Sequence, residues 1–298
     1  MDFLLELNNA VQGLENRLAV SPDPPPSIFI IGVPRSGTTL ISQLLSACTE
    51  VGYVNNLMAR FWMAPAVGAR LSLEVLRQRV FTGHSSYGQT ICIEEPHEFG
   101  GFWRHYLGYS DMRQKPTDDG IDWQRLVQTL NRISSVFACP VVYKVFQLYW
   151  HLQVFHEHLP LSRWIWVRRD PVENALSLLK MRKDKTGSMD EWFSAFPLGA
   201  EQYDGEPGWV QVAVQVHLIE KWIHGQLSRI PLDAWMEITL ENLCSAPETV
   251  VKELADKLNV SVHEKNLQQV SANIMPEKFT GKDAALRKNI ETVFAQLS

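Results

Sequence analysis

The sequence has few cysteines, and their spacing forms no known pattern. The four residues, Cys48, Cys92, Cys139 and Cys244, lie far apart and share no C-x-x-C spacing. Such spacing argues against a disulfide framework and against a zinc site, and it favours a reducing compartment. We therefore expect a cytoplasmic protein that binds no metal.

The sequence also lacks a long apolar run and an excess of basic residues. No apolar run approaches the roughly 20 residues that a helix needs to span a bilayer. Residues 1–20 lack the basic start of a signal peptide. A net charge of −5 provides no general attraction to nucleic acid. We expect neither a membrane span nor a nucleic-acid partner.

Length and composition limit the domain organisation. With 298 residues, 45% of them hydrophobic, the chain can form one large core or two small ones, and we expect a single domain, 1–298. Apolar residues at helical spacing predict an N-terminal helix over 1–20, which either packs at the edge of the domain or docks on a partner protein. The stretch SPDPPPS, 21–27, ends that helix as a stiff, proline-rich connector. The oligomeric state is not indicated.

After the connector, apolar runs that suit buried strands alternate with stretches of helical periodicity. The predicted strands cover 28–32, 140–146, 163–169 and 234–240. The predicted helices cover 56–80, 97–107, 122–136, 171–183, 208–228 and 247–258. This alternation predicts an α/β fold with a parallel sheet that helices cover on both faces.

The stretch SIFIIGVPRSGTTLISQLL, 27–45, has the order strand, glycine loop, helix that a phosphate-binding loop requires. Gly32 and Gly37 have the spacing of G-x-x-x-x-G-K-[ST], but Thr38 stands in the lysine position. Backbone N–H groups and the helix dipole still attract phosphate or sulfate at such a loop. The loop therefore predicts an anion site that lacks the usual lysine.

The surroundings of the loop suit an anion that binds without magnesium. In loops that hydrolyse ATP, the lysine reaches the terminal phosphates and an acidic strand end helps to hold magnesium. Here Arg35 lies inside the loop, and Arg168 and Arg169 follow the apolar run WIWV where an acid would be expected. A nucleotide kinase or ATPase, or a nucleotide-binding protein without catalytic activity, is the alternative interpretation.

The stretch GVPRSGTTL, 32–40, resembles the 5′-phosphosulfate loop of the sulfotransferases that use 3′-phosphoadenosine-5′-phosphosulfate (PAPS). The closest resemblance is to the branch of tyrosylprotein and bacterial sulfotransferases. The family fold has three α/β/α layers around a central parallel sheet, with this phosphate-binding loop. The resemblance implies that PAPS, and its product PAP, bind through Pro34, Arg35, Ser36, Gly37, Thr38 and Thr39.

A second stretch, WVRRDPVENALSLL, 166–179, resembles the 3′-phosphate motif of the same family. Arg169 leaves the end of a predicted strand, where a guanidinium can bind a phosphate through two hydrogen bonds. Pro171 suits the first position of the helix that follows. Ser177, about two turns along that helix, can add a hydroxyl to the same anion.

Three further segments resemble the family more weakly. YKVFQLYWHL, 143–152, matches at Lys144 but has Phe146 in place of a proline. TLENLCSAP, 239–247, departs from the family pattern at Leu240 and Asn242. EKFTGKDAAL, 277–286, resembles a segment that closes over the nucleotide, and its candidate contacts are Lys278, Gly281 and Lys282.

The resemblance implies in-line transfer of a sulfuryl group to a hydroxyl or amine, and it leaves the catalytic base open. Lys144 is placed to neutralise the leaving phosphate, and Arg35 is a second catalytic candidate. The bases known in the family are missing, because Phe146 replaces the histidine of one branch and 52–58 contains no carboxylate. His97 and Glu98 are the next candidates.

The stretch IEEPHEFGGFW, 93–103, holds these candidates. With Pro96 near the first helical position, the helix dipole would keep His97 neutral, as a base requires. Behind His97 and Glu98 come Glu94, Glu95 and His84.

The acceptor is not identified by the sequence. A small molecule, a sugar, a peptide or a carrier-bound hydroxyl compound would each suit an aromatic cleft. The candidates to line such a cleft are Trp62, Trp103, Trp123, Trp150 and Trp192, although core packing is the alternative. The basic run KMRKDK, 180–185, either attracts an acidic acceptor or forms a solvated face.

Overall fold

A parallel sheet of five strands forms the centre of the computed structural model, in the order β2-β3-β1-β4-β5. The structure describes residues 2–76, 79–108, 113, 118–271, 274 and 284–297. The strands are β1 (Ser27–Gly32), β2 (Gly52–Tyr53), β3 (Val141–Lys144), β4 (Arg163–Arg168) and β5 (Trp235–Thr239). The predicted parallel sheet is confirmed, and the short edge strand β2 is an addition to it.

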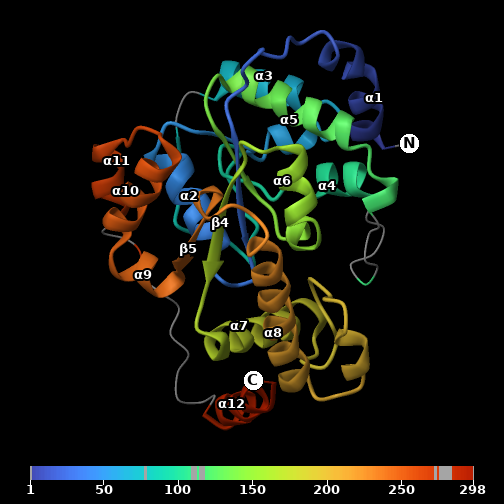
Figure 1. Ribbon diagram of the computed structural model, residues 1–298, viewed down its shortest axis with the longest axis vertical. Helices are drawn as coiled ribbons and strands as arrows, with labels where there is room; N and C mark the ends of the chain where they lie inside the picture. Colours follow the sequence, from blue (N-terminus) through green and yellow to red (C-terminus); the bar gives the residue numbers. More distant parts are fainter. Residues whose placement is uncertain are drawn as a thin grey trace.

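Helices cover both faces of this sheet (Figure 1). They are α1 (Phe3–Glu15), α2 (Thr38–Cys48), α3 (Pro65–Val75), α4 (Gly100–Leu107), α5 (Trp123–Phe137), α6 (Leu152–His158), α7 (Pro171–Thr186), α8 (Gly208–Leu227), α9 (Leu240–Ser245), α10 (Pro247–Leu258), α11 (Glu264–Ser271) and α12 (Ala284–Leu297). Within the described ranges, no helix has the length and apolar character that a bilayer crossing needs.

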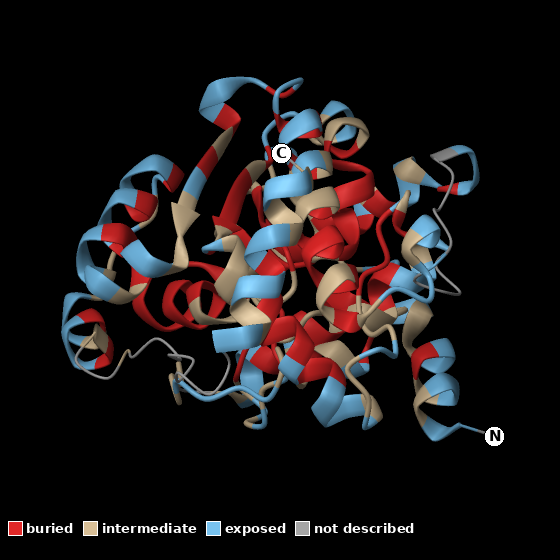
Figure 2. Cartoon of the chain, turned by 90° about the horizontal axis from the view of Figure 1, so that it is seen from below, coloured by how far each residue is buried: buried red, intermediate tan, exposed pale blue. Residues whose placement is uncertain are grey.

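The alternation of side chains along β1 produces two hydrophobic cores. Phe29 and Ile31 pack on one face, together with apolar residues of α5, α6, α7 and α8. Ile28 and Ile30 pack on the other face, against α2, α10 and α11. Figure 2 shows these buried residues gathered in the middle of the molecule, with exposed surfaces on the outer helices. The predicted three-layer α/β/α architecture is confirmed, whereas the single domain stays a prediction.

Four predicted helices match α5, α7, α8 and α10, but two others differ from the structure. The predicted helix over 56–80 is replaced by a short 3-10 turn, Met58–Arg60, and by α3. The predicted helix over 97–107 begins only at Gly100. Pro96 instead forms a β-bridge with Asn55, which holds this part of the chain extended.

The N-terminal helix α1 is attached by polar rather than apolar side chains. Phe3 is 71% exposed, whereas Asn8 and Glu15 are buried. The Glu15 carboxylate accepts hydrogen bonds from the amides of Ala66 and Val67, at 3.1 and 2.9 Å, in the first turn of α3. A carboxylate is favourable at a helix N-terminus, which explains why a charged residue anchors the helix.

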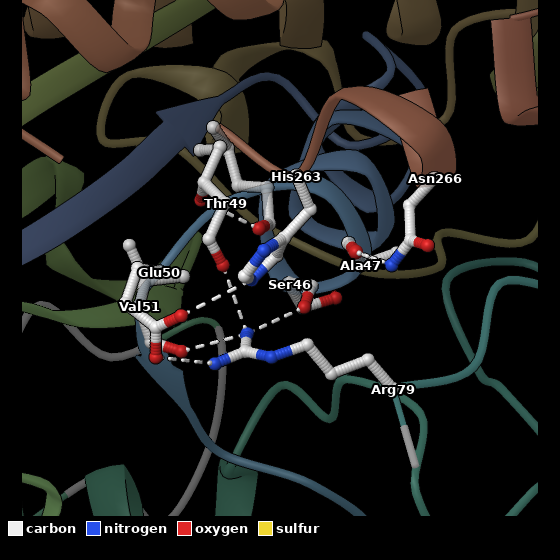
Figure 3. A network of polar contacts seen from close by, with 9 residues as sticks. Ser46, Ala47, Thr49, Glu50, Val51, Arg79, His263 and Asn266 are labelled. Carbon is white, nitrogen blue, oxygen red and sulfur yellow. Dashed lines mark hydrogen bonds and ion pairs between the residues drawn. The ribbon is translucent and has the colours of Figure 1, made fainter. Parts of the chain in front are cut away.

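The far end of α2 is held by one arginine (Figure 3). Arg79 Nη1 donates to the carbonyls of Ser46, Thr49 and Val51, at 2.8, 3.0 and 3.0 Å. Its Nη2 lies 3.4 Å from Oε1 of Glu50. A helix ends with unpaired carbonyls, and a cation there is also favoured by the helix dipole. Arg79 therefore fixes α2 at the end opposite its glycine loop.

That loop brings α2 into close contact with the start of α9. Gly37, the N-cap residue of α2, has a φ of 105°, in the region that favours glycine. A Cβ atom at this position would lie 2.7 Å from Leu240 Cδ1. Any larger residue would therefore meet both backbone strain and a steric clash.

We expect Arg79→Met to lower the free energy of unfolding by about 2 kcal/mol, because carbonyls of α2 and its end lose a charged donor. Urea unfolding measures this change. Arg70→Met is the control, since Arg70 is exposed and pairs with Glu74, at 2.8 Å within α3. This change should cost less than about 0.5 kcal/mol. Equal losses in the two variants would contradict the role of Arg79.

We expect alanine substitutions at two glycines to have opposite signs. Gly37→Ala should destabilise the fold by about 1–3 kcal/mol through strain and the clash with Leu240. Gly13→Ala should stabilise it by about 0.5–1 kcal/mol, because Gly13 lies within α1 and an added Cβ would meet nothing within 4 Å. Thermal unfolding of both variants checks the sign of each change.

Candidate functional site

A cleft of about 570 Å³ lies beside the carboxyl ends of β1, β3 and β4. Several of the predicted site residues line it, namely Pro34, Arg35, Gly37, Thr38, Thr39, Glu98, Lys144 and Arg169. Ser36 and Ser177 are buried next to the same turns. Lys278, Gly281 and Lys282 lie outside the described residues.

The glycine loop presents backbone amides to this cleft. It connects Gly32, the last residue of β1, to Thr38, the first residue of α2. No side chain caps α2, because its N-cap residue is Gly37. The N–H groups of the first helical turn are therefore directed at the cleft, and the helix dipole makes this end attractive to an anion.

The second predicted anion motif adjoins the loop. Arg35 Nε donates to Ser177 Oγ at 3.1 Å, and Arg169 Nη1 donates to the carbonyl of Arg35 at 3.2 Å. Asn174 Nδ2 donates to the carbonyl of Pro34 at 2.8 Å. The start of α7 is thus bonded to the loop, and the two arginines lie side by side in one site.

The remaining residues of the second motif have structural roles. Asp170 caps α7 by accepting from the amides of Val172 and Glu173, at 3.0 and 2.9 Å. Its own amide donates to Glu241 Oε1 at 3.0 Å, so α9 also holds this turn.

Arg168 and Arg169 point to different environments although they are neighbours in the sequence. Arg168 pairs with Glu220 and Glu237, at 3.3 and 3.1 Å. It is not among the described residues that line the cleft, whereas Arg169 is. The alternation of side chains along a strand therefore assigns only the second arginine to the site.

Lys144 connects the glycine loop to a carboxylate. Its side chain is only 2% exposed, and Nζ lies 3.2 Å from Glu98 Oε1. The same nitrogen donates to Thr39 Oγ1 at 3.0 Å and to the carbonyl of Gly88 at 2.7 Å. Burial lowers the pKa of Lys144, and the Glu98 carboxylate opposes this shift. A single ammonium group therefore contacts both the anion loop and an acid.

The structure separates the two principal base candidates. The Glu98 side chain is 32% exposed and lines the cleft. His97 is absent from the described lining, and its Nδ1 accepts from the amide of Phe99 at 2.8 Å. The pKa of His97 is lowered, first by burial and then by Lys144. The predicted cause, a helix N-terminus, is wrong because α4 begins only at Gly100.

The other candidate bases are placed less favourably. Glu95 is 1% exposed, and its carboxylate accepts from Gln43 Nε2 and from the hydroxyl of Thr82. Glu95 therefore connects α2 to the segment around Thr82, and it is not among the described residues that line the cleft. Glu94 also lies outside that lining, while His84 is an exposed residue at the cleft.

The segment 79–89 forms a wall of the cleft that the sequence did not predict. It runs back along α2, from Arg79 at the C-terminal end to Gly88 beside Lys144. On the way, Gln43 of α2 donates to the carbonyl of His84 at 3.2 Å. The segment contains a tight turn, closed by a β-bridge between Ser86 and Gln89, but no helix or longer strand, and long-range side-chain contacts place it.

Tyr87 of this segment connects the wall to the loop and to α7. Arg35 lies over its ring at 5.2 Å, and Lys185 lies at 5.3 Å from the ring centre. Its hydroxyl donates to Asp184. Cations are attracted to the face of an aromatic ring, so these contacts close one side of the cleft.

The prediction that tryptophans line the cleft is wrong for its described part. No tryptophan occurs among the described lining residues, and Trp103 and Trp150 are buried in the core. The aromatic side chains of the lining are Phe81, Tyr87, Phe146 and Phe193. Burial in the core provides more apolar contact for so large a side chain than the wall of a solvated cleft does.

Comparison with known proteins agrees with this architecture. The chain is similar in fold to sulfotransferase STF9 from Mycobacterium avium, with 15% identity and a TM-score of 0.62 over 98% of this chain and 80% of that one. It is also similar to sulfotransferase STF1 from Mycobacterium tuberculosis H37Rv, with 13% identity and a TM-score of 0.58 over 98% and 81%. No curated protein matches the sequence significantly.

The sequence profile of the sulfotransferase family matches residues 26–264. This range runs from the connector before β1 to the start of α11 and includes the glycine loop, Lys144 and the second anion motif. The predicted resemblance is confirmed: the chain belongs to the sulfotransferase family.

Proposed function

We propose that the protein transfers a sulfuryl group from PAPS to a hydroxyl or amine of a small-molecule, sugar, peptide or carrier-bound acceptor, without a metal. One observation carries this proposal. Two anion-binding motifs from different parts of the chain adjoin, with Arg169 Nη1 3.2 Å from the Arg35 carbonyl and Arg35 Nε 3.1 Å from Ser177 Oγ. The family membership supports sulfuryl transfer in general.

The residues of the site fit the two charged ends of PAPS. PAPS supplies an activated sulfuryl group on its 5′-phosphate and carries a separate 3′-phosphate. The uncapped start of α2 and Arg35 suit the 5′ end, because backbone amides and a guanidinium bind such oxygens. Arg169 and Ser177 suit the 3′-phosphate. A triphosphate is one continuous chain, so two adjoining sites on different turns favour PAPS over ATP.

Glu98 is suited to remove the acceptor proton during the transfer, and Lys144 is suited to neutralise the charge on the leaving group. When the acceptor oxygen bonds to sulfur, its proton has to leave, and the Glu98 carboxylate facing the cleft can accept it. The bond from sulfur to the phosphate oxygen breaks at the same time. Lys144 Nζ, 3.0 Å from Thr39 Oγ1, can neutralise the charge that develops on that oxygen.

Arg35 adds positive charge at the loop, while His97 has no part in this scheme. His97 Nδ1 is engaged with the amide of Phe99. A cytoplasmic location of the protein stays a prediction from its cysteine spacing.

The first test concerns the donor. We expect PAP to raise Tm in a thermal-shift assay more than ADP or ATP with magnesium does, because only PAP has two separate phosphates for the two sites. A rise with ATP and magnesium alone would favour a kinase or ATPase instead.

We expect Arg35→Ala and Arg169→Ala each to weaken PAP binding about tenfold or more, since a charged hydrogen-bond donor contributes about 1.5–3 kcal/mol. Calorimetric titration with PAP measures the affinity. Arg168→Ala is the matched control, because Arg168 pairs with Glu220 and Glu237. Unchanged affinity in both site variants, or an equal loss in the control, would refute the assignment of the anion sites.

We expect Glu98→Gln to slow sulfuryl transfer by about 10²–10⁴-fold, the usual effect of losing a general base. The assay follows labelled sulfate from PAPS to a panel of phenols, alcohols, amines and sugars. PAP affinity should change less than about threefold, because the ion-pair partner of Glu98 is Lys144 and not a residue of either anion motif.

His97→Asn is the companion variant, since asparagine keeps an acceptor for the amide of Phe99. Its transfer rate should stay within about fivefold of wild type, because no proton passes through His97. If the transfer rate fell strongly in His97→Asn and little in Glu98→Gln, His97 rather than Glu98 would be the general base.

A further inference from the structure

Arg182 is the exception in the basic run 180–185. It is fully buried in α7, whereas Lys183 and Lys185 of the same run are exposed. Its guanidinium donates to the side-chain oxygens of Gln211 and Gln215, at 2.7 and 3.1 Å. The run therefore has a solvated face of lysines, as one of the two interpretations predicts, whereas its central charge at Arg182 is withdrawn from solvent.

The hydrogen-bond partners of this arginine are neutral side chains. Trp192 packs over the guanidinium at 4.5 Å. Burial lowers the pKa of Arg182 to about 10, and the Asp190 carboxylate opposes this shift. Within the described part of the chain, Arg182 forms no direct ion pair, and the Asp190 carboxylate acts on it from a longer distance. Burying a cation without a counter-ion is costly, so its hydrogen bonds to the two glutamines define the geometry of this region.

Each glutamine that binds Arg182 also bonds a different backbone segment through its NH₂ group. Gln211 donates to the Glu206 carbonyl. The amide group of Gln215 donates to the carbonyls of Ala195 and Phe193. Trp192 Nε1 also donates to the Ala195 carbonyl, at 3.3 Å. Because Arg182 occupies the oxygen of Gln215, the NH₂ group of that side chain has to point at the turn 193–195.

This turn forms part of the cleft. Phe193 and Ser194 line it, together with Met181, the neighbour of Arg182. Ser194 has a φ of 71°, which is uncommon for a residue other than glycine. Such a conformation persists only where surrounding contacts impose it, and the Gln215 and Trp192 hydrogen bonds supply those contacts.

The position of the turn 193–195 in the cleft indicates that it faces the acceptor rather than PAPS. Along α7, Ser177 contacts the glycine loop, and Met181 lies about one turn farther from the anion motifs. Phe146 lines the cleft two residues after Lys144. Phe193, Met181 and Phe146 are apolar, so the hydroxyl of Ser194 is the one side-chain hydrogen-bonding group among these four lining residues, fewer than a sugar would need.

We propose that Arg182, acting through Gln215, positions the turn 193–195 as the acceptor wall of the cleft, and that this wall holds the apolar body of an aromatic or aliphatic hydroxyl compound. The inference rests on the proposed sulfuryl transfer and narrows its acceptor class. Arg182 is a positioning residue, since it is buried and is not among the described residues that line the cleft.

Two matched variants test whether Arg182 positions the turn 193–195 through Gln215. Gln215→Glu keeps an acceptor for Arg182 and adds a counter-charge, but it removes the donor to Phe193 and Ala195. Gln211→Glu makes the same chemical change four residues away on α8, where the lost donor bonds the Glu206 carbonyl and no residue of the turn 193–195. Both variants retain the charge of Arg182, so folding should be preserved.

Hydrogen exchange and calorimetry measure the consequences, with 2-naphthol as the probe acceptor added to the PAP complex. In Gln215→Glu, amides of the turn 193–195 should exchange about tenfold faster and 2-naphthol should bind about tenfold more weakly, as expected for a lost hydrogen bond. PAP affinity should stay within about twofold. Gln211→Glu should leave all three measurements near wild type.

The positioning role, the acceptor class and the proposed function can each fail separately in these measurements. Unchanged exchange at the turn in Gln215→Glu would overturn the positioning role, whatever binds in the cleft. Failure of 2-naphthol to bind the wild-type PAP complex would overturn the acceptor class. Failure of PAP itself to bind would overturn the proposed function, while the exchange result would still test the positioning role. Should Gln215→Glu not fold, Trp192→Phe removes the second donor to Ala195 and should speed exchange there to a smaller extent.

Discussion

The cleft depends on how closely β1 and β4 run beside each other at their carboxyl ends. Gly32 pairs with Val167, and a Cβ atom at Gly32 would lie only 2.4 Å from the Val167 carbonyl oxygen. This approach makes the turns that follow the two strands neighbours in space. Arg169 can then reach the Arg35 carbonyl at 3.2 Å, and Arg35 can reach Ser177 at 3.1 Å. Two turns, each with an arginine, therefore form one continuous surface of the cleft.

The helix α2 also shapes the cleft, because its two ends attract groups of opposite charge. Its first turn offers uncapped amides to the cleft, while Arg79 satisfies carbonyls at its other end (Figure 3). These two arrangements follow from opposite partial charges at the ends of a helix. Because Arg79 also starts the segment 79–89, the same contact directs that segment back to the loop, where the Gly88 carbonyl meets Lys144.

Buried charged side chains organise the irregular parts of this fold. Glu15 accepts from the first amides of α3, Glu95 holds the segment 79–89 through Thr82, and Arg182 orients the turn 193–195 through Gln215. Irregular segments lack the repeating hydrogen bonds of helices and strands, so their buried backbone groups need other partners. Long polar side chains from elsewhere in the chain supply such partners, as Gln215 of α8 does for the carbonyls of Phe193 and Ala195.

The amino-acid sequence was sufficient for those features that depend on neighbours along the chain. Glycine spacing, apolar periodicity and the R-D-P turn predicted the strand–loop–helix units that contain Arg35 and Arg169. Whether Glu98 or His97 faces the cleft depended on contacts with distant residues: Pro96 bridges to Asn55, and α4 therefore starts late. The partners of Arg182 and the course of 79–89 are likewise set by residues far away in the sequence. A local pattern specifies which backbone hydrogen bonds form nearby, but it carries no information about which distant partner satisfies a buried charge.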